Sequence, residues 1–185
     1  MPIDALDRGF PAESLRQERE RVVQQHIQAE QRGDWDAALA AFHRPRYEIV
    51  ATGDTYDGPD AVTTLYGETA RAFPELSFDL GAVHHARDAV LCEVLFRGAQ
   101  RGSWRGLPAT GRLVQYRMLN VFVFDDDRLV CERMYFDLLT PLRQLGVARD
   151  PTSWSGRLAI ALNHPLVLAR TLIRAALRAD RPKLT

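Results

Sequence analysis

The stretch that decides the fold is Arg112–Gly146, RLVQYRMLNVFVFDDDRLVCERMYFDLLTPLRQLG. Its apolar and β-branched residues predict two strands, Arg112–Phe124 and Arg128–Phe136, joined by three aspartates. An amphipathic turn, Leu138–Leu145, follows the second strand and ends at Gly146. Polar side chains recur inside the apolar runs, which a hairpin that only fills a core does not need. We therefore predict that this hairpin forms the wall of a ligand pocket.

The segments before this hairpin predict helices first and then strands. Apolar periodicity predicts helices at Ala12–Arg32, Trp35–Phe42 and Pro59–Phe73, and strands at Tyr47–Ala51, Phe78–His84 and Ala89–Gln100. Gly33 suits the end of the first helix, and Asp34 suits the cap of the second. Because helices and strands are segregated, the fold class is α+β. We expect a curved mixed or antiparallel sheet wrapped around helices as an open cone, a cystatin-like α+β barrel.

The chain divides by composition into an N-terminal arm (1–11), a cone domain (12–149) and a basic helical tail (150–185). From Pro151 to Thr185 there are six basic residues and one acidic residue, a net charge of +5 in a chain whose total is zero. Helical pieces are expected at Ser155–Leu162 and Pro165–Ala179. Three explanations of this tail remain open: it packs on its own body or a second subunit, it lies on an anionic membrane surface, or it binds a protein partner.

Bulk composition excludes several classes of function. Lys+Arg and Asp+Glu both number 24, so no global attraction to nucleic acid is expected. The N-terminus is too charged for a signal peptide and no window is apolar enough to span a membrane, so a cytoplasmic protein is expected. Cys92 and Cys131 read as buried free thiols. The histidine spacing predicts no metal site, and the absence of P-loop, GxGxxG and GxSxG motifs disfavours nucleotide binding and nucleophilic hydrolysis.

Several motifs resemble one family. The runs RGDWDAALAAF, GPDAV, FPELSF, GLPATGR and ERMYFDLLTPLRQLGV, within about 31–147, resemble the SnoaL-like polyketide cyclase (ester cyclase) branch of the nuclear-transport-factor-like superfamily. The resemblance implies the cone fold, a homodimer formed through the sheet, a hydrophobic small-molecule ligand and no cofactor. It also implies an acid at the end of the last strand that catalyses an intramolecular aldol ring closure. Asp137 holds that position, whereas Arg133 replaces the tryptophan common four residues earlier.

Strict strand alternation puts Arg133, Tyr135 and Asp137 on one face of the last strand. If that face lines the cavity, these three are the catalytic residues. Burial raises the pKa of a carboxyl group and a nearby arginine lowers it, so Asp137 could transfer protons near neutral pH. The alternatives are that Asp137 only caps the turn that follows it, and that Arg117 and Arg133 form structural ion pairs with Glu93 or Glu132.

Candidate substrate-binding residues come from the aromatic and amide side chains of the predicted cone. They are Tyr47, Tyr66, Trp104, Gln115, Arg117 and Asn120. Trp104 lies in the glycine-rich loop RGSWRGLPATG and is a candidate lid residue. The aromatic residues could equally be core, and the amides could equally satisfy buried backbone groups.

Three functions remain open from the sequence. The leading hypothesis is a cofactor-independent cyclase or isomerase acting by general acid/base catalysis on a hydrophobic, polyketide-like carbonyl compound. The second is an epoxide-hydrolase-like enzyme, which requires Glu93 or Asp79 to point inward as a second carboxylate beside Asp137. The third is a non-catalytic module that binds a hydrophobic ligand.

Overall fold

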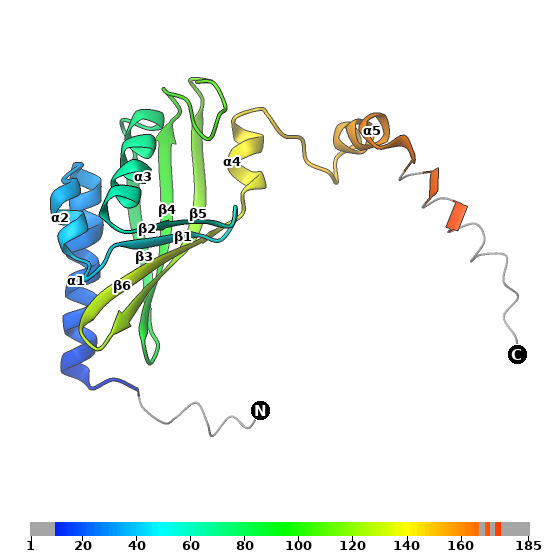
Figure 1. The fold of residues 1–185 in the computed structure, drawn as a ribbon. Helices are drawn as coiled ribbons and strands as arrows, with labels where there is room; N and C mark the ends of the chain where they lie inside the picture. Colours follow the sequence, from blue (N-terminus) through cyan, green and yellow to red (C-terminus); the bar gives the residue numbers. More distant parts are fainter. Residues whose placement is uncertain (1–9, 167–168, 171–172, 175–185) are drawn as a thin grey trace, which may run out of the picture. The chain divides into compact units, whose positions relative to one another are not determined.

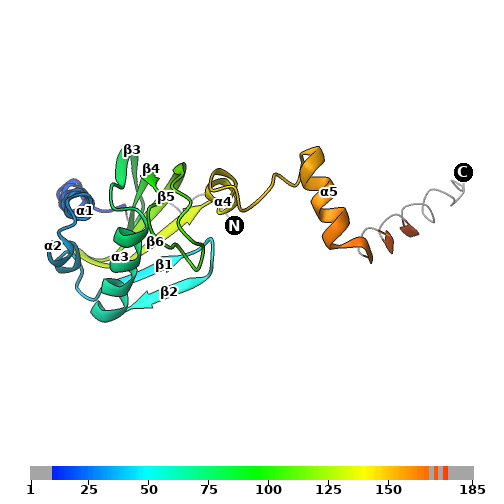
Figure 2. The ribbon, with the colours of Figure 1, turned by 90° about the horizontal axis from the view of Figure 1, so that it is seen from above.

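The computed structural model describes residues 10–166, 169–170 and 173–174. The chain divides into two compact units, residues 1–145 and 146–185. The first unit is α+β, with a curved six-stranded sheet and helices α1, α2 and α3 gathered on one face of it (Figure 1). Seen from above, the strands follow an arc around α3 (Figure 2). The predicted class is confirmed, and the sheet stays open instead of closing into a barrel.

The helices of the first unit begin and end where local chemistry predicts. They are α1 Glu13–Arg32, α2 Trp35–Ala40, α3 Pro59–Ala72 and α4 Leu139–Gln144. Gly33 ends α1 with a φ of 68°, a conformation that glycine adopts without a steric penalty. The Asp34 carboxylate accepts a hydrogen bond from the backbone nitrogen of Ala37 and so caps α2. Pro59 opens α3 at its first turn.

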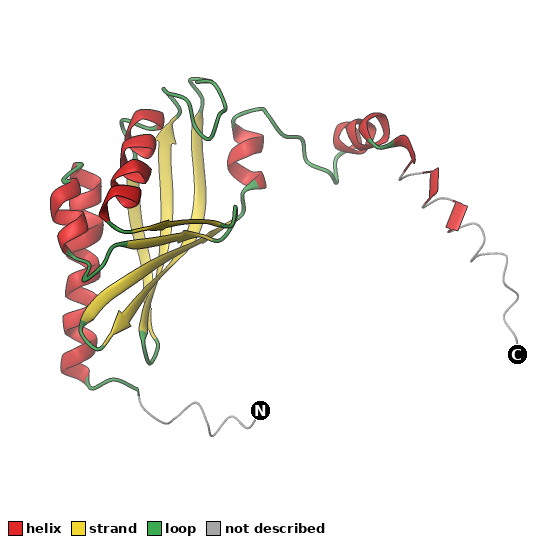
Figure 3. Ribbon diagram, viewed as in Figure 1, coloured by secondary structure: helices red, strands yellow, loops and turns green. Residues whose placement is uncertain are grey.

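The sheet has the strand order β2-β1-β6-β5-β4-β3 (Figure 3). The strands are β1 Arg46–Ile49, β2 Asp54–Asp57, β3 Ser77–His85, β4 Ala89–Ala99, β5 Leu113–Asp125 and β6 Arg128–Phe136. All pairs are antiparallel except β1 with β6, which is parallel. The sequence placed no strand at β2, because these four residues lie in a Gly-, Asp- and Pro-rich segment that is typical of a turn. Pairing with β1 stabilises that strand, and such pairing is not visible in local composition.

One irregularity in the hairpin decides which side chains face inward. Val123 pairs with Cys131, but the next residue, Phe124, pairs with Leu129. Val130 is therefore an extra residue, a β-bulge in β6. Because a one-residue shift exchanges the two faces of a strand, the inward set after Leu129 continues at Glu132. The expectation of strict alternation from Leu129 through Asp137 is wrong.

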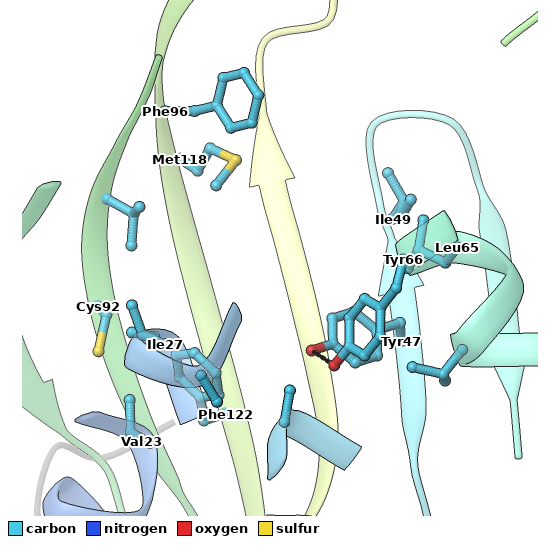
Figure 4. Close-up of a cluster of buried hydrophobic side chains, with 14 of the residues drawn as sticks. Val23, Ile27, Tyr47, Ile49, Leu65, Tyr66, Cys92, Phe96, Met118 and Phe122 are labelled. Atoms are coloured by element: carbon cyan, nitrogen blue, oxygen red, sulfur yellow. Dashed lines mark hydrogen bonds between the residues drawn. The ribbon is translucent and has the colours of Figure 1, made fainter. Parts of the chain in front are cut away.

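The core lies between the concave face of the sheet and helices α1 and α3. Figure 4 shows Val23 and Ile27 of α1 packed with Cys92 and Phe122 of the sheet. Both cysteines are free and buried, as predicted. Burial raises the pKa of Cys92 to about 12 and that of Cys131 to about 11. These thiols therefore act as apolar side chains.

The second unit contains α5, Trp154–Asn163. The Ser153 hydroxyl accepts a hydrogen bond from the backbone nitrogen of Gly156 and caps this helix. The described residues beyond His164 (165–166, 169–170 and 173–174) are also helical, and the predicted end of that helix at Ala179 lies outside the described residues. Across the described residues, no helix has the length and apolar character that a membrane span requires.

Asp137 follows β6 and caps α4. Its carboxylate accepts hydrogen bonds from the backbone nitrogen of Leu139 at 3.0 Å and from the Thr140 hydroxyl at 2.6 Å. The hydrogen bond from Thr140, followed by that from Leu139, lowers the pKa of Asp137. The side chain is exposed and ionised at neutral pH, which is the capping arrangement that the sequence left open as an alternative.

We predict that Asp137→Ala destabilises the protein modestly and leaves ligand binding in the cavity unchanged, because it removes a cap and no cavity group. Urea unfolding measures the first effect and calorimetric titration with a hydrophobic ligand the second. Asp137→Asn, which keeps one acceptor oxygen, is the matched control and should lose less stability. A loss of ligand affinity in Asp137→Ala would contradict this assignment.

Candidate functional site

A cavity of about 340 Å³ opens in the first unit, on the concave face of the sheet. Its volume falls in the range of small-molecule sites. Most of its wall is aromatic or aliphatic, contributed by α2, α3 and all six strands. Representative lining residues are Trp35, Tyr56, Leu65, Phe73, Phe78, Phe96, Tyr116, Met118, Met134 and Phe136. Such a wall suits a hydrophobic ligand.

The loop between β4 and β5 contributes Trp104 and Arg105 to the cavity wall. Gln100, fully buried, anchors this loop by accepting hydrogen bonds from the backbone nitrogen and hydroxyl of Thr110. Arg105 forms an ion pair with Asp54 of β2, so the loop is tied to a strand fifty residues away in sequence. Trp104 packs edge-on against Phe73, with ring centroids 5.7 Å apart. The predicted placement of Trp104 beside the cavity is therefore observed.

A buried polar cluster interrupts this apolar wall, centred on Glu132 of β6. Glu132 is 1% exposed and lines the cavity. One carboxylate oxygen accepts a hydrogen bond from the Asn120 amide at 2.7 Å, and the other lies 3.2 Å from Nε2 of His26. Burial, and next the charge of Glu30, raise the pKa of Glu132, while His26 opposes the shift. A buried carboxylate with a raised pKa at a cavity wall is a candidate for proton transfer.

His26 connects this cluster to two helices. Its Nδ1 lies 3.0 Å from the carbonyl oxygen of Ala38 in α2, and its Nε2 faces Glu132. Burial by itself would lower the pKa of His26. The charge of Glu30 and the hydrogen bond to Glu132 outweigh burial and raise the pKa to about 10. An imidazolium donates from both nitrogens, so this charge state satisfies both contacts.

Two tyrosines complete the cluster. The Tyr47 hydroxyl lies 2.7 Å from a Glu30 oxygen. It also lies 2.8 Å from the Tyr66 hydroxyl (Figure 4). Burial, with the nearby carboxylates, raises the pKa of each tyrosine far above its ordinary value. Trp35 stacks on Tyr66 at 4.9 Å and fixes its ring. Both hydroxyl groups therefore stay protonated at physiological pH and are hydrogen-bond donors.

Asn120 leaves one buried acceptor unused. Its amide nitrogen donates to Glu132, which sets the orientation of the side chain, and its Oδ1 is buried with no hydrogen-bond partner. A buried acceptor without a donor costs about 1–3 kcal/mol. Asn120 lines the cavity, so a hydroxyl or N–H group of a ligand can satisfy this oxygen.

The donor types in this cluster also suit a divalent ion. Among the described residues, His26, Glu30 and Glu132 form one set whose donor atoms all lie within 4.8 Å of one another. Imidazole nitrogen and carboxylate oxygen are common zinc ligands. The distances from His26 to the Glu30 and Glu132 carboxylates equally fit the contacts of a protonated imidazole.

Four of the predicted binding residues line the cavity and the other five predicted site residues do not. Tyr47, Tyr66, Trp104 and Asn120 are in the wall. Gln115 and Arg117 are exposed on the opposite face of β5, and Tyr135 is 42% exposed. Arg133 pairs with Glu48 at 2.6 Å, so it is in an ion pair, although with neither of the partners anticipated. The expectation that Arg133, Tyr135 and Asp137 face the cavity is wrong, because the bulge at Val130 turns the opposite face inward.

Sequence reasoning missed His26, Glu30 and Glu132. His26 and Glu30 are one helical turn apart, beside the apolar positions Val23 and Ile27 of α1. Two polar residues four positions apart on the apolar stripe of a helix indicate a buried polar pair, and this pattern is visible in the sequence. Glu132 had no such signal, because its inward direction depends on the bulge.

Comparisons with solved structures show that the fold of the first unit is a known one. Structures with the same fold include a ketosteroid-isomerase-like protein from Catenulispora acidiphila (17% identity, TM-score 0.59, covering 68% of this chain and 92% of that one). IdmH from Streptomyces antibioticus is similar (23% identity, TM-score 0.58, covering 70% and 99%). So is an LEH-like epoxide hydrolase from M. tuberculosis (23% identity, TM-score 0.56, covering 80% and 97%). A search of curated proteins finds no match.

The sequence itself matches a family model over residues 20–145, which include most of α1, the other helices and the whole sheet of the first unit, and every residue of the buried cluster. The chain belongs to the SnoaL-like polyketide cyclase family.

Proposed function

We propose that this protein is a cofactor-independent cyclase or isomerase that transfers a proton on a hydrophobic, polyketide-like carbonyl compound, with Glu132 as the general acid/base. The observation that carries the proposal is a carboxylate 1% exposed in an apolar cavity, held from two sides by His26 and Asn120. This arrangement fixes the carboxylate and keeps bulk water from it. Both conditions favour proton transfer from a weak carbon acid.

The reaction has two proton transfers. Glu132 takes a proton from the carbon next to a substrate carbonyl, and the electron pair moves onto the carbonyl oxygen as an enolate. For ring closure, the enolate carbon then attacks a second carbonyl of the same molecule, and Glu132 returns the proton to the resulting alkoxide. His26 keeps its own protons throughout, and its positive charge stabilises the ionised form of Glu132.

Tyr66 is the candidate donor to the enolate oxygen. It lines the cavity, and the hydrogen bond that it shares with Tyr47 can be redirected to a substrate oxygen. Asn120 would favour substrates that have a hydroxyl or enol group near the reacting carbon, because such a group can donate a hydrogen bond to its unpartnered Oδ1. Trp35, Trp104 and the phenylalanines of the wall would hold the rest of the molecule.

A second candidate function is epoxide hydrolysis. Glu93 and Asp79, which the sequence suggested as its second carboxylate, are both exposed, and Asp79 pairs with Arg97. The cavity wall nevertheless contains a second carboxylate beside Glu132, that of Glu30. Glu132 could activate a water molecule while Tyr66 protonates the opening epoxide. Turnover of an epoxide but of no carbonyl compound would favour this reaction, and ligand binding without turnover of either would favour a non-catalytic binding module.

The acid/base assignment can be tested with a panel of hydrophobic β-diketones as substrates. NMR measures the rate at which their α-protons exchange for deuterium. We predict that Glu132→Gln lowers the exchange rate roughly 10²–10⁴-fold. The wild-type rate should rise with pH around a midpoint above the ordinary glutamate value of 4.5, because the base must be ionised and its pKa is raised. Glu48→Gln, on the outer face, is the matched control and should retain the rate. Undiminished exchange in a folded Glu132→Gln protein would exclude Glu132 as the base.

We predict that His26 stays protonated well above the ordinary histidine range, with its imidazole titrating near pH 10 in NMR. Because the folded state binds this proton more tightly than the unfolded state does, the associated stability is fully present below about pH 6.5. It is lost as the pH rises through 10, so the free energy of unfolding should fall over this window. The fall should be smaller in a His26→Gln variant. A neutral His26 at pH 8 would contradict the proposed ion pair.

We also propose that the protein is a homodimer formed through the outer face of the sheet. Partly exposed apolar side chains lie side by side there, on neighbouring strands: Leu91, Leu95, Leu119 and Val121. Leu119→Arg should convert the dimer to a monomer in light scattering, because it places a long charged side chain at the centre of this apolar patch, where contact with a partner would remove it from water. Phe10→Arg, at an exposed position outside the sheet, is the control and should stay dimeric. A monomeric wild-type chain would refute the proposal.

A further inference from the structure

The helical segment after the cone domain has an apolar stripe in contact with solvent. Trp154, Leu158 and Leu162 recur every four residues along α5, and they are 79%, 49% and 72% exposed. Leu166 and Ile173 are 72% and 59% exposed in the helical residues that follow. Single exposed apolar side chains are common on protein surfaces, but a row along one helix face marks an interaction site.

α5 is a defined helix in its own right. The Ser153 hydroxyl caps its first turn, and Gly156 lies so close to the preceding loop that an added Cβ would be 1.8 Å from the carbonyl oxygen of Asp150. The loop and the helix are therefore packed against each other through a glycine. This local packing uses the Gly156 side of the helix. On a wheel of 100° per residue, Trp154, Leu158 and Leu162 lie on the opposite side.

The charge pattern identifies the kind of partner. Between Pro151 and Ala179 the sequence has four arginines and no aspartate or glutamate. Arg157, Arg170 and Arg174 are exposed, and each lies within one helical turn of an apolar residue of the stripe. Arginine at the border of an apolar stripe can place its stem on apolar material and its guanidinium beside an anion. Trp154, on the same stripe, suits the boundary between the hydrocarbon layer and the lipid headgroups.

We propose that α5 and the described helical residues after it (165–166, 169–170 and 173–174) dock in the plane of an anionic lipid surface, with the apolar stripe among the acyl chains and the arginines at the headgroup phosphates. Pairing of this segment with the same segment of a second copy is disfavoured, because arginines would meet arginines without a compensating acid. An anionic bilayer supplies negative charge and an apolar layer along the whole segment. Docking would keep the cavity near the phase into which a hydrophobic substrate partitions, although the lipid contact does not depend on the proposed catalysis.

The test is co-sedimentation of the full chain with vesicles of phosphatidylcholine alone and of phosphatidylcholine with one third phosphatidylglycerol. We expect binding to the anionic vesicles, weakening as salt is raised, and little binding to the neutral ones. The triple variant Arg157→Glu/Arg170→Glu/Arg174→Glu should lose affinity for the anionic vesicles by roughly 100-fold or more. Each basic residue at such a surface contributes about fivefold to the affinity. The matched control Arg32→Glu/Arg101→Glu/Arg112→Glu changes three exposed arginines of the first unit and should bind as the wild type does.

A second readout locates the contact. Tryptophan emission should shift to the blue on addition of anionic vesicles, and Trp154→Phe should lose that shift while it still co-sediments. Three results would overturn the proposal: equal binding to neutral and anionic vesicles, full binding by the tail triple variant, or no binding at low salt. If the tail substitutions converted the chain to a monomer, the apolar stripe would instead be a contact with a second copy of the chain.

Discussion

The contact between the Glu132 carboxylate and His26 is the interaction on which the rest of the site depends. A carboxylate taken out of water costs several kcal/mol unless a cation and hydrogen bonds offset that cost. Here the cation comes from α1, and the carbonyl oxygen of Ala38 in α2 holds the far side of the same ring. The contact thus joins two helices to β6. It leaves a charged group at the wall of a cavity that is otherwise apolar.

The bulge at Val130 gives this interaction its position. Without the extra residue, β6 would present Arg133 and Tyr135 to the cavity and Glu132 to solvent. With it, Arg133 forms an ordinary surface pair with Glu48, and Asp137 caps α4. Bulges redirect side chains at many functional sites. In this chain the single bulge residue Val130 decides that the cavity wall contains the acidic Glu132 and not the basic Arg133.

The two units differ in the way they carry charge. In the first, many charged groups have a partner of opposite charge, as in the His26–Glu132 contact and the Arg105–Asp54 link at the β4–β5 loop. In the second, the arginines between Pro151 and Ala179 have no acid among them, and they lie beside exposed apolar side chains. Pairing stabilises a specific internal geometry, whereas a segment whose sequence has arginines and no acid favours an external anionic partner. Charged residues therefore have two different tasks in this chain: they stabilise the internal geometry of the first unit, and they favour an external partner for the second.

The sequence by itself determined the features that depend on neighbouring residues. Caps and glycine signals placed the ends of the helices, apolar runs placed five of the six strands, and family motifs identified the fold. Four of the aromatic and amide side chains proposed for the cone do line the cavity: Tyr47, Tyr66, Trp104 and Asn120. Only the tertiary structure decided the rest. Strand β2 needs β1 beside it, the bulge needs β5 opposite β6, and His26 meets Glu132 across 106 positions of sequence. These outcomes depend on long-range packing, and local propensity and strand periodicity contain no information about which distant side chain will be the partner.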